Sequence, residues 1–274
     1  MNRTLTPIPG ESRETIVLAG NPNKKRLERK CFRLESKEKK VEMYSSLKVN
    51  RVATVLILFG VLVTAGVPGW AGKPASGDLL TIARLKYRGG GDWYNDPSMI
   101  PNLLEELRIR SSLLTADDQA IVSLSDDQLF SYPVLFITGH GNIRFDSNEA
   151  ERLRTYLDSG GFLIADDDYN MDESFRREIT RVFPDSPLVE LPFSHPIYHV
   201  FYDFDQGPPK IHEHYKGAPK GFGIFRNGRL VVYYTYNSNI SDGWADPDIH
   251  KDPPEIREEA FRMGINVIMY TLIQ

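Results

Sequence analysis

The chain has 274 residues, of which 41% are hydrophobic and 26% are charged, and its net charge at pH 7 is −4. Its single cysteine is Cys31, so residues 32–274 contain no disulfide, cysteine nucleophile or thiolate metal site. Residues 1–51 carry 13 Lys and Arg and 6 Asp and Glu, so their net charge is +7 and the net charge of residues 52–274 is −11. That acidic remainder lacks the clustered basic side chains that bind phosphate, and we expect no nucleic-acid partner.

An uncharged apolar segment, residues 52–72 (VATVLILFGVLVTAGVPGWAG), follows the basic extension at residues 1–51. Its length is typical of a signal-peptide core and slightly short for a membrane span of about 20 residues. Two interpretations stay open: a signal peptide cleaved near Ala71, giving a periplasmic or secreted protein, or an uncleaved anchor in the inner membrane. If Met43 is the true start, residues 1–42 are an upstream extension. Both interpretations predict export across the cytoplasmic membrane.

Residues 78–274 predict a single α/β domain. The expected strands are at 79–87, 120–124, 134–138, 162–165 and 188–191, and an Asn-Gly hairpin is expected at 223–234. Helices are expected at 146–159, 172–183 and 254–271, and another with Asp96 as its N-cap and Pro97 at its first position. Strands that alternate with helices are typical of a parallel sheet covered on both faces. We predict a flavodoxin-like three-layer sandwich with a mostly parallel sheet of order 2-1-3-4-5, plus a C-terminal β-hairpin and a terminal helix. Arg84 and Lys86 share one side of the first strand, so this side is expected to be exposed near the end of the strand.

Glycine, aspartate and aromatic residues follow the first, third and fourth predicted strands. In the order 2-1-3-4-5 these strand ends meet at one edge of the sheet, where α/β folds bind their ligands. The expected ligand-binding residues are therefore Gly90, Asp92, Trp93, Tyr94, Gly139, His140, Gly141, Asp166, Asp167 and Asp168.

Five of the six histidines lie between residues 140 and 214, and three consecutive aspartates lie in the same stretch. Imidazole and carboxylate groups bind divalent metals, which makes a metal site conceivable although the sequence requires no cofactor. The candidate ligands are His140, Asp168, His195, His212 and His214. No H-E-x-x-H or other specific metal motif is present. The alternative is that these histidines form hydrogen bonds with the backbone and that the aspartates cap helices and form turns.

Several segments resemble one bacterial family, and they do so in order along the chain. They are RLKYRGGGDWYNDP at 84–97, FITGHGNI at 136–143, LRTYLDSGGFLIADD at 153–167, HPIYH at 195–199 and PKIHEH at 209–214. The family is domain of unknown function 4159, and the resemblance covers residues 78–274. It implies a domain similar to the class I glutamine amidotransferase-like fold, and it implies no activity. Amidotransferases of that fold carry a cysteine on the turn after the third strand; here that turn is Gly139-His140-Gly141, which excludes a thiol mechanism.

Three functions stay open at this point. The first is a bacterial envelope domain that binds an unknown small molecule or envelope protein in the cleft at the C-terminal ends of the parallel strands. The second is a metal-dependent or acid–base hydrolase with His140, Asp167 and His195 as catalytic residues. The third is a structural envelope component without a ligand. If residues 52–72 are not cleaved, the membrane is a further partner.

Overall fold

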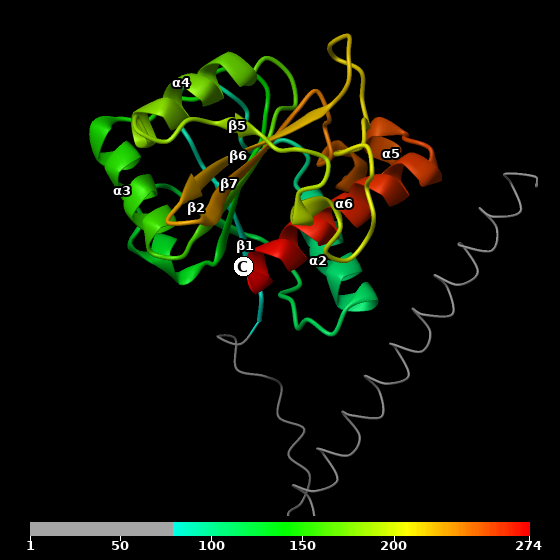
Figure 1. Cartoon of the computed structure of the whole chain (residues 1–274). Helices are drawn as coiled ribbons and strands as arrows, with labels where there is room; N and C mark the ends of the chain where they lie inside the picture. Colours follow the sequence, from blue (N-terminus) through cyan, green and yellow to red (C-terminus); the bar gives the residue numbers. More distant parts are fainter. Residues whose placement is uncertain (1–78) are drawn as a thin grey trace, which may run out of the picture. The chain divides into compact units, whose positions relative to one another are not determined.

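The computed structural model describes residues 79–274, and it is an α/β sandwich (Figure 1). The basic extension at 1–51, the start at Met43, the apolar segment at 52–72 and the cleavage near Ala71 lie outside the described residues. Within the described part of the chain, no helix combines the length and the apolar character that a membrane span needs.

A seven-stranded sheet forms the middle layer. Its strands are β1 (Ile82–Leu85), β2 (Ala120–Val122), β3 (Val134–Ile137), β4 (Phe162–Asp166), β5 (Val189–Glu190), β6 (Lys220–Arg226) and β7 (Arg229–Tyr236), in the order β2-β1-β3-β4-β7-β6-β5. The pairs β2–β1, β1–β3, β3–β4 and β4–β7 are parallel, whereas β6 pairs antiparallel with β7 and with β5. The predicted sandwich with a mostly parallel sheet, a C-terminal hairpin and a terminal helix is confirmed.

The position next to β4 differs from the sequence prediction. We predicted the strand at 188–191 there, but β7 of the hairpin occupies it, with Leu163 paired to Val232, and β5 lies at the far edge beside β6. A strand in the middle of a parallel sheet is buried on both faces, which requires a continuous apolar run. The β7 run Leu230-Val-Val-Tyr-Tyr234 is fully buried, whereas both residues of β5 are exposed. The loop after β7 therefore reaches the carboxyl edge of the sheet.

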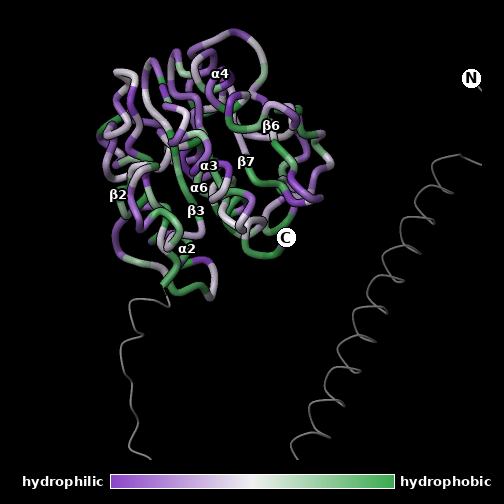
Figure 2. The backbone as a smooth tube through the Cα atoms, turned by 90° about the vertical axis from the view of Figure 1, so that its left-hand side faces the viewer, coloured by the Kyte–Doolittle hydropathy of each residue, from purple (hydrophilic) through white to green (hydrophobic). Residues whose placement is uncertain are grey.

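Helices cover both faces of the sheet. Helices α2 (Met99–Arg110) and α6 (Pro254–Ile273) pack on one face, and α3 (Ser147–Asp158) and α4 (Asp172–Val182) pack on the other (Figure 1). Alternate strand residues enter the two cores: Phe136 faces α2 and α6, while Leu135 faces α3 and α4. Figure 2 shows β3 as a hydrophobic stretch near the middle of the domain.

Arg84 and Asp96 differ from the prediction. The Arg84 side chain is 1% exposed rather than exposed, and its guanidinium donates to the backbone oxygens of Asn95 at 2.5 Å and of Asp96 at 3.2 Å. Asp96 takes a left-handed conformation with φ of 42°, so it does not cap the helix as predicted, and α2 begins later, at Met99. A buried guanidinium is tolerated because its donors are directed at acceptors, the backbone oxygens of the loop at 93–96 and the side chain of Gln119.

Candidate functional site

Four loops meet at the carboxyl edge of the parallel strands. The loop after β1 joins the loop after β3 through the Gly91 N–H, which donates to the Asn142 oxygen at 3.1 Å. The loop after β3 joins the loop after β4 through the Gly141 N–H, which donates to the Tyr169 oxygen at 3.0 Å. The loop after β7 is fixed by the Ser241 N–H, which donates to an Asp166 carboxylate oxygen at 2.8 Å. Residues far apart in the sequence therefore form one polar surface at this edge of the sheet, which we call the rim.

His140 lies between two carboxylates of this rim. Its Nδ1 is 2.9 Å from Asp92 Oδ2, and its Nε2 is 3.3 Å from Asp168 Oδ2. Burial lowers the pKa of His140, but the negative charge of Asp168 and the hydrogen bond with Asp92 outweigh it, so the pKa is raised. Its side chain is 49% exposed, which leaves the imidazole accessible to a bound molecule. The geometry is that of a carboxylate-oriented acid–base group.

The three consecutive aspartates have different surroundings. Asp166 is fully buried and accepts hydrogen bonds from Ser241 and Thr235, so it fastens the loops from inside the sheet. Asp167 accepts from the Met171 N–H at 3.1 Å and has one buried oxygen without a hydrogen-bond partner. Asp168 alone faces the histidines. Burial raises the pKa of Asp166 to about 6, of Asp167 to about 7 and of Asp168 to about 7.

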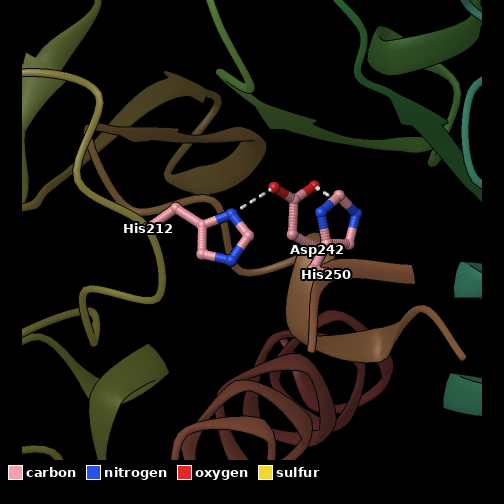
Figure 3. Close-up of side chains that lie close together, drawn as sticks. All are labelled: His212, Asp242 and His250. Atoms are coloured by element: carbon pink, nitrogen blue, oxygen red, sulfur yellow. Dashed lines mark hydrogen bonds and ion pairs between the residues drawn. The ribbon is translucent and has the colours of Figure 1, made fainter. Parts of the chain in front are cut away.

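Two further histidines flank Asp242, which begins a short 3-10 helix, η3 (Asp242–Trp244) (Figure 3). His212 Nδ1 lies 2.8 Å from Asp242 Oδ2, and His250 Nε2 lies 3.8 Å from Asp242 Oδ1. The other ring nitrogen of His212 is 2.7 Å from Asp252. His250 is the last residue of the short helix α5 (Pro247–His250), and its Nε2 also lies 2.9 Å from Asp96 Oδ2. One donor atom from each of His212, Asp242 and His250 falls within 4.8 Å of the others.

Asp242 also belongs to a second group of potential metal ligands. One donor atom each of Asp168, His214 and Asp242 lie within 4.8 Å of one another. His214 Nε2 is 3.9 Å from Asp168 Oδ1, beyond hydrogen-bond range. The Asn239 amide joins the two carboxylates, since its Nδ2 donates to Asp168 Oδ1 and to Asp242 Oδ2, each at 3.1 Å.

The surroundings of Asp242 favour its ionised form. Burial opposes its ionisation, yet the hydrogen bond with His212 and the field of His250 hold the pKa of Asp242 below its ordinary value. The hydrogen bond with Asp242 raises the pKa of His212 to about 9, with a smaller contribution from Asp252. Asp242 is only 2% exposed, and its Oδ1 has no hydrogen-bond partner. Buried carboxylate oxygens are normally paired, so this one requires an explanation.

His195 lies away from the rim, contrary to the prediction that grouped it with His140. Its ring packs against Phe225 and Tyr270, and its Nδ1 accepts from the Ile197 N–H at 3.2 Å. Phe225 pairs with Leu230 at the start of β7, which is the end of that strand opposite to the rim. The sequence prediction failed because the stretch around 195 follows β5, which lies at the far edge of the sheet. His195 caps the turn η2 (Pro196–Tyr198).

The remaining predicted ligand-binding residues shape the rim. Gly139 has φ of +135°, and a Cβ at this position would lie 2.5 Å from the Tyr87 hydroxyl, so glycine is required where the two loops approach. Gly90 and Gly141 also have positive φ in the same pair of loops. Trp93 is partly buried and packs edge-on against Tyr94, which is 64% exposed.

Four acidic and histidine residues of the rim were not predicted as site residues: Asp96, Asp242, His250 and Asp252. Asp96 was interpreted as a helix cap, and the other three follow β7. They lie near His212 because β7 lies beside β4. Placing the apolar β7 run beside β4 in the sequence prediction would have identified them.

Two hollows lie beside the rim rather than over it. One of about 570 Å³ is lined by Lys86, Tyr87, Arg88, Ile121, Val122, Ser123, Ser125, Asp126, Asp146, Asn148 and Glu149. The other, of about 620 Å³, is lined by Arg88, Gly89, Arg144, Phe145, Asp146, Ser147 and Arg181. Arg88, which lines both, is already paired with Asp146 and Glu149. Size alone therefore does not locate the chemistry, and the clustered donor atoms of the rim do.

The family comparison agrees with the sequence resemblance. Residues 81–272 match the family described as Domain of unknown function (DUF4159). The chain belongs to this family. Its description states no activity, so the function has to be argued from the geometry of the rim. No curated protein matches the chain.

Proposed function

We propose that the domain is a metal-dependent hydrolase whose divalent transition-metal ion is held by His212, Asp242 and His250. The observation that carries the proposal is the buried Asp242 carboxylate, which lies between two imidazoles with its Oδ1 unpaired. Two imidazoles and one carboxylate form a ligand set that suits zinc, iron, manganese or cobalt.

The distance between His250 and Asp242 fits two ligands around an ion, whereas His212 Nδ1 lies at hydrogen-bond distance from Asp242, 2.8 Å. Metal bonds of about 2.0–2.2 Å separate neighbouring ligand atoms by about 3–3.5 Å. The 3.8 Å between His250 Nε2 and Asp242 Oδ1 is too long for a hydrogen bond and close to that separation. His212 also has the outer carboxylate that metal-bound histidines usually have, since its Nε2 is 2.7 Å from Asp252. Both imidazoles are partly exposed, so the ion would face solvent and substrate.

The hydrolytic role rests on His140 beside this group. An ion with three protein ligands keeps a coordination position open and supplies Lewis acidity to an oxygen of water or substrate. His140 is oriented by Asp92 and exposed toward the rim, so it is placed to accept a proton from water or to give one to the leaving group. Asp168 links the two parts through Asn239.

This proposal uses the rim at the strand ends, where the ligand-binding hypothesis placed a cleft for a small molecule or protein partner, and it gives that rim a reaction. It also changes the residues of the hydrolase hypothesis. His140 stays, Asp92 and Asp168 replace Asp167 as its partners, and His195 has no part. A bacterial envelope location, reached by export through residues 52–72, is part of the proposal and is supported by the sequence of that segment.

Metal content tests the first half of the proposal. The full chain, stripped with a chelator and reloaded with Zn²⁺, should retain one or more ions per chain, and His250→Ala should lose at least one. His195→Asn is the matched control, because an Asn oxygen can replace the ring nitrogen that caps η2 and the residue lies away from the rim. Equal metal content in the wild type and in His250→Ala would contradict the proposed site.

Turnover tests the second half. We expect the loaded chain to hydrolyse at least one of a panel of p-nitrophenyl esters and phosphates, and His140→Ala to lower kcat by about 10²-fold or more while the bound metal is kept. Metal retention with unchanged kcat in His140→Ala would remove His140 from the reaction.

A further inference from the structure

We infer that the rim binds a second divalent transition-metal ion, with Asp168 and His214 as its own ligands and Asp242 as a carboxylate shared by both ions. This inference rests on the proposed function and adds a site to it. The starting observation is that the two groups of donor atoms, His212–Asp242–His250 and Asp168–His214–Asp242, have Asp242 in common.

The distance between His214 and Asp168 resembles the distance between His250 and Asp242 in the first group. His214 Nε2 and Asp168 Oδ1 are 3.9 Å apart, beyond hydrogen-bond range but near the separation of two ligands on one ion. A carboxylate has two oxygens, so a single aspartate can serve two ions. In two-metal hydrolytic sites the ions are about 3.5–4 Å apart, a distance that one bridging carboxylate spans.

The surrounding amides hold the second group in place. Asn95 Nδ2 donates to Asp168 Oδ2 at 2.8 Å, and Asn239 Nδ2 donates to both Asp168 and Asp242 at 3.1 Å. Asn239 is buried, and its Oδ1 has no hydrogen-bond partner. The two carboxylates are therefore fixed at a set spacing by amide donors, as outer residues orient metal ligands. Asp168 Oδ1, the oxygen nearest His214, accepts one of these hydrogen bonds and has a second lone pair for an ion.

Charge supports two ions rather than one. Five carboxylates surround the four histidines of the rim: Asp92, Asp96, Asp168, Asp242 and Asp252. Within residues 79–274, their ion pairs are with histidines and none is with lysine or arginine. With all five carboxylates ionised and the four histidines neutral, the state that metal binding would favour, one divalent ion would leave an excess of three negative charges and two ions would leave one; without metal, protonation of His212 offsets part of this charge. Uncompensated charge in a partly buried site is unfavourable, so the second ion offsets it.

The ion count of the full chain, titrated with Mn²⁺ after chelation, tests this inference. We expect the wild type to bind two equivalents and to show the electron paramagnetic resonance spectrum of a coupled pair. His214→Ala should bind one equivalent with the spectrum of an isolated ion. Asp168→Asn, which keeps the size of the side chain, should do the same, and Asp242→Ala should lose both. His195→Asn should still bind two.

The results separate this inference from the proposed function. One equivalent in the wild type that is lost in His250→Ala and unaffected by His214→Ala would overturn the second site and leave the one-ion hydrolase standing. Two equivalents that persist in both His214→Ala and Asp168→Asn would place the second ion elsewhere and overturn the assignment. No bound Mn²⁺ or Zn²⁺ in the wild type would overturn both proposals.

Discussion

Replacing Arg84 by methionine should destabilise the domain and loosen the rim together. The Arg84 guanidinium donates to the side chain of Gln119 at 2.8 Å and to the backbone oxygens of Trp93, Asn95 and Asp96. Methionine keeps much of the apolar contact and removes all of these bonds. The loop released in this way supplies the Asn95 amide to Asp168 and the Asp96 carboxylate to His250.

The expected loss follows from the number and the setting of these bonds. Each hydrogen bond from a charged donor contributes about 1.5–3 kcal/mol, so four of them would sum to about 6–12 kcal/mol if they were independent. They are not independent, because three acceptors belong to one loop whose carbonyl oxygens can turn toward water once released. We therefore expect a loss of about 3–5 kcal/mol, the usual result of removing one partner from a buried charged group. For a domain of this size that lowers Tm by about 6–20 °C.

Urea denaturation and thermal unfolding of the full chain measure this loss. Lys86→Met, two residues further along, is the matched control: its ammonium lies 5.6 Å above the Trp93 ring and is exposed, so about 1 kcal/mol or less should be lost. Arg84→Lys should fall between the two, because an ammonium cannot reproduce the planar fork. An Arg84→Met variant within about 0.5 kcal/mol of the wild type would show that the loop is held by other contacts, and the reasoning would fail.

Three more predictions follow from the rim and from α4. Gly139→Ala should destabilise the domain by about 2 kcal/mol, because the added Cβ would clash with neighbouring atoms. Gly90→Ala should cause backbone strain alone, because no atom lies within 4 Å of its added Cβ. Denaturation curves of the two variants measure the difference in stability. Burial opposes ionisation of Glu178, but the Phe145 N–H and two arginines outweigh it and lower the pKa of this carboxyl in the folded state. The ionised Glu178 therefore stabilises the domain above about pH 4.5, and this stabilisation is lost as the pH falls through the lower folded-state pKa. Glu178→Gln should therefore differ from the wild type at pH 7 and converge with it near pH 3; a constant difference would refute this. Finally, since the pKa of His212 is raised to about 9, metal binding at pH 7 should release about one proton from it, measured by calorimetry in two buffers, and no release would contradict its role as a ligand.

The sequence predicted those parts of the fold in which burial leaves a local signature. The β3 and β4 strands are charge-free apolar runs that end at glycine or aspartate, and each is followed by a helix with an amphipathic stripe. These patterns predicted the order of the first four strands and the meeting of the loops at 89–94, 139–141 and 166–168. Placing Asp92 next to His140, and His140 next to Asp168, required no more than that order.

The parts that were missed depend on long-range competition between strands. Both the stretch at 188–191 and the hairpin strand β7 could extend the sheet beyond β4, and only the buried area on both faces decides between them. Because β7 takes that place, the loop carrying Asp242 and the following His250 come to the rim, and His195 goes to the other end of the sheet. Arg84 was misjudged for a similar reason: a charged side chain on a strand suggests solvent, and its acceptors lie in a loop whose path the sequence does not show.

Asp242 is joined to the hydrophobic core through the Gly243-Trp244 pair that follows it. The Trp244 side chain is buried, and its Nε1 donates to the Ala260 oxygen of α6 at 2.8 Å. Gly264 makes room for this ring, since a Cβ there would lie 2.7 Å from it. The carboxylate that both metal groups share is thus anchored to the core between α2 and α6, while His212 and His214 come from a loop. Both proposed metal sites would therefore be located by Asp242, the ligand that they share and that packing of Trp244 against α6 holds in place.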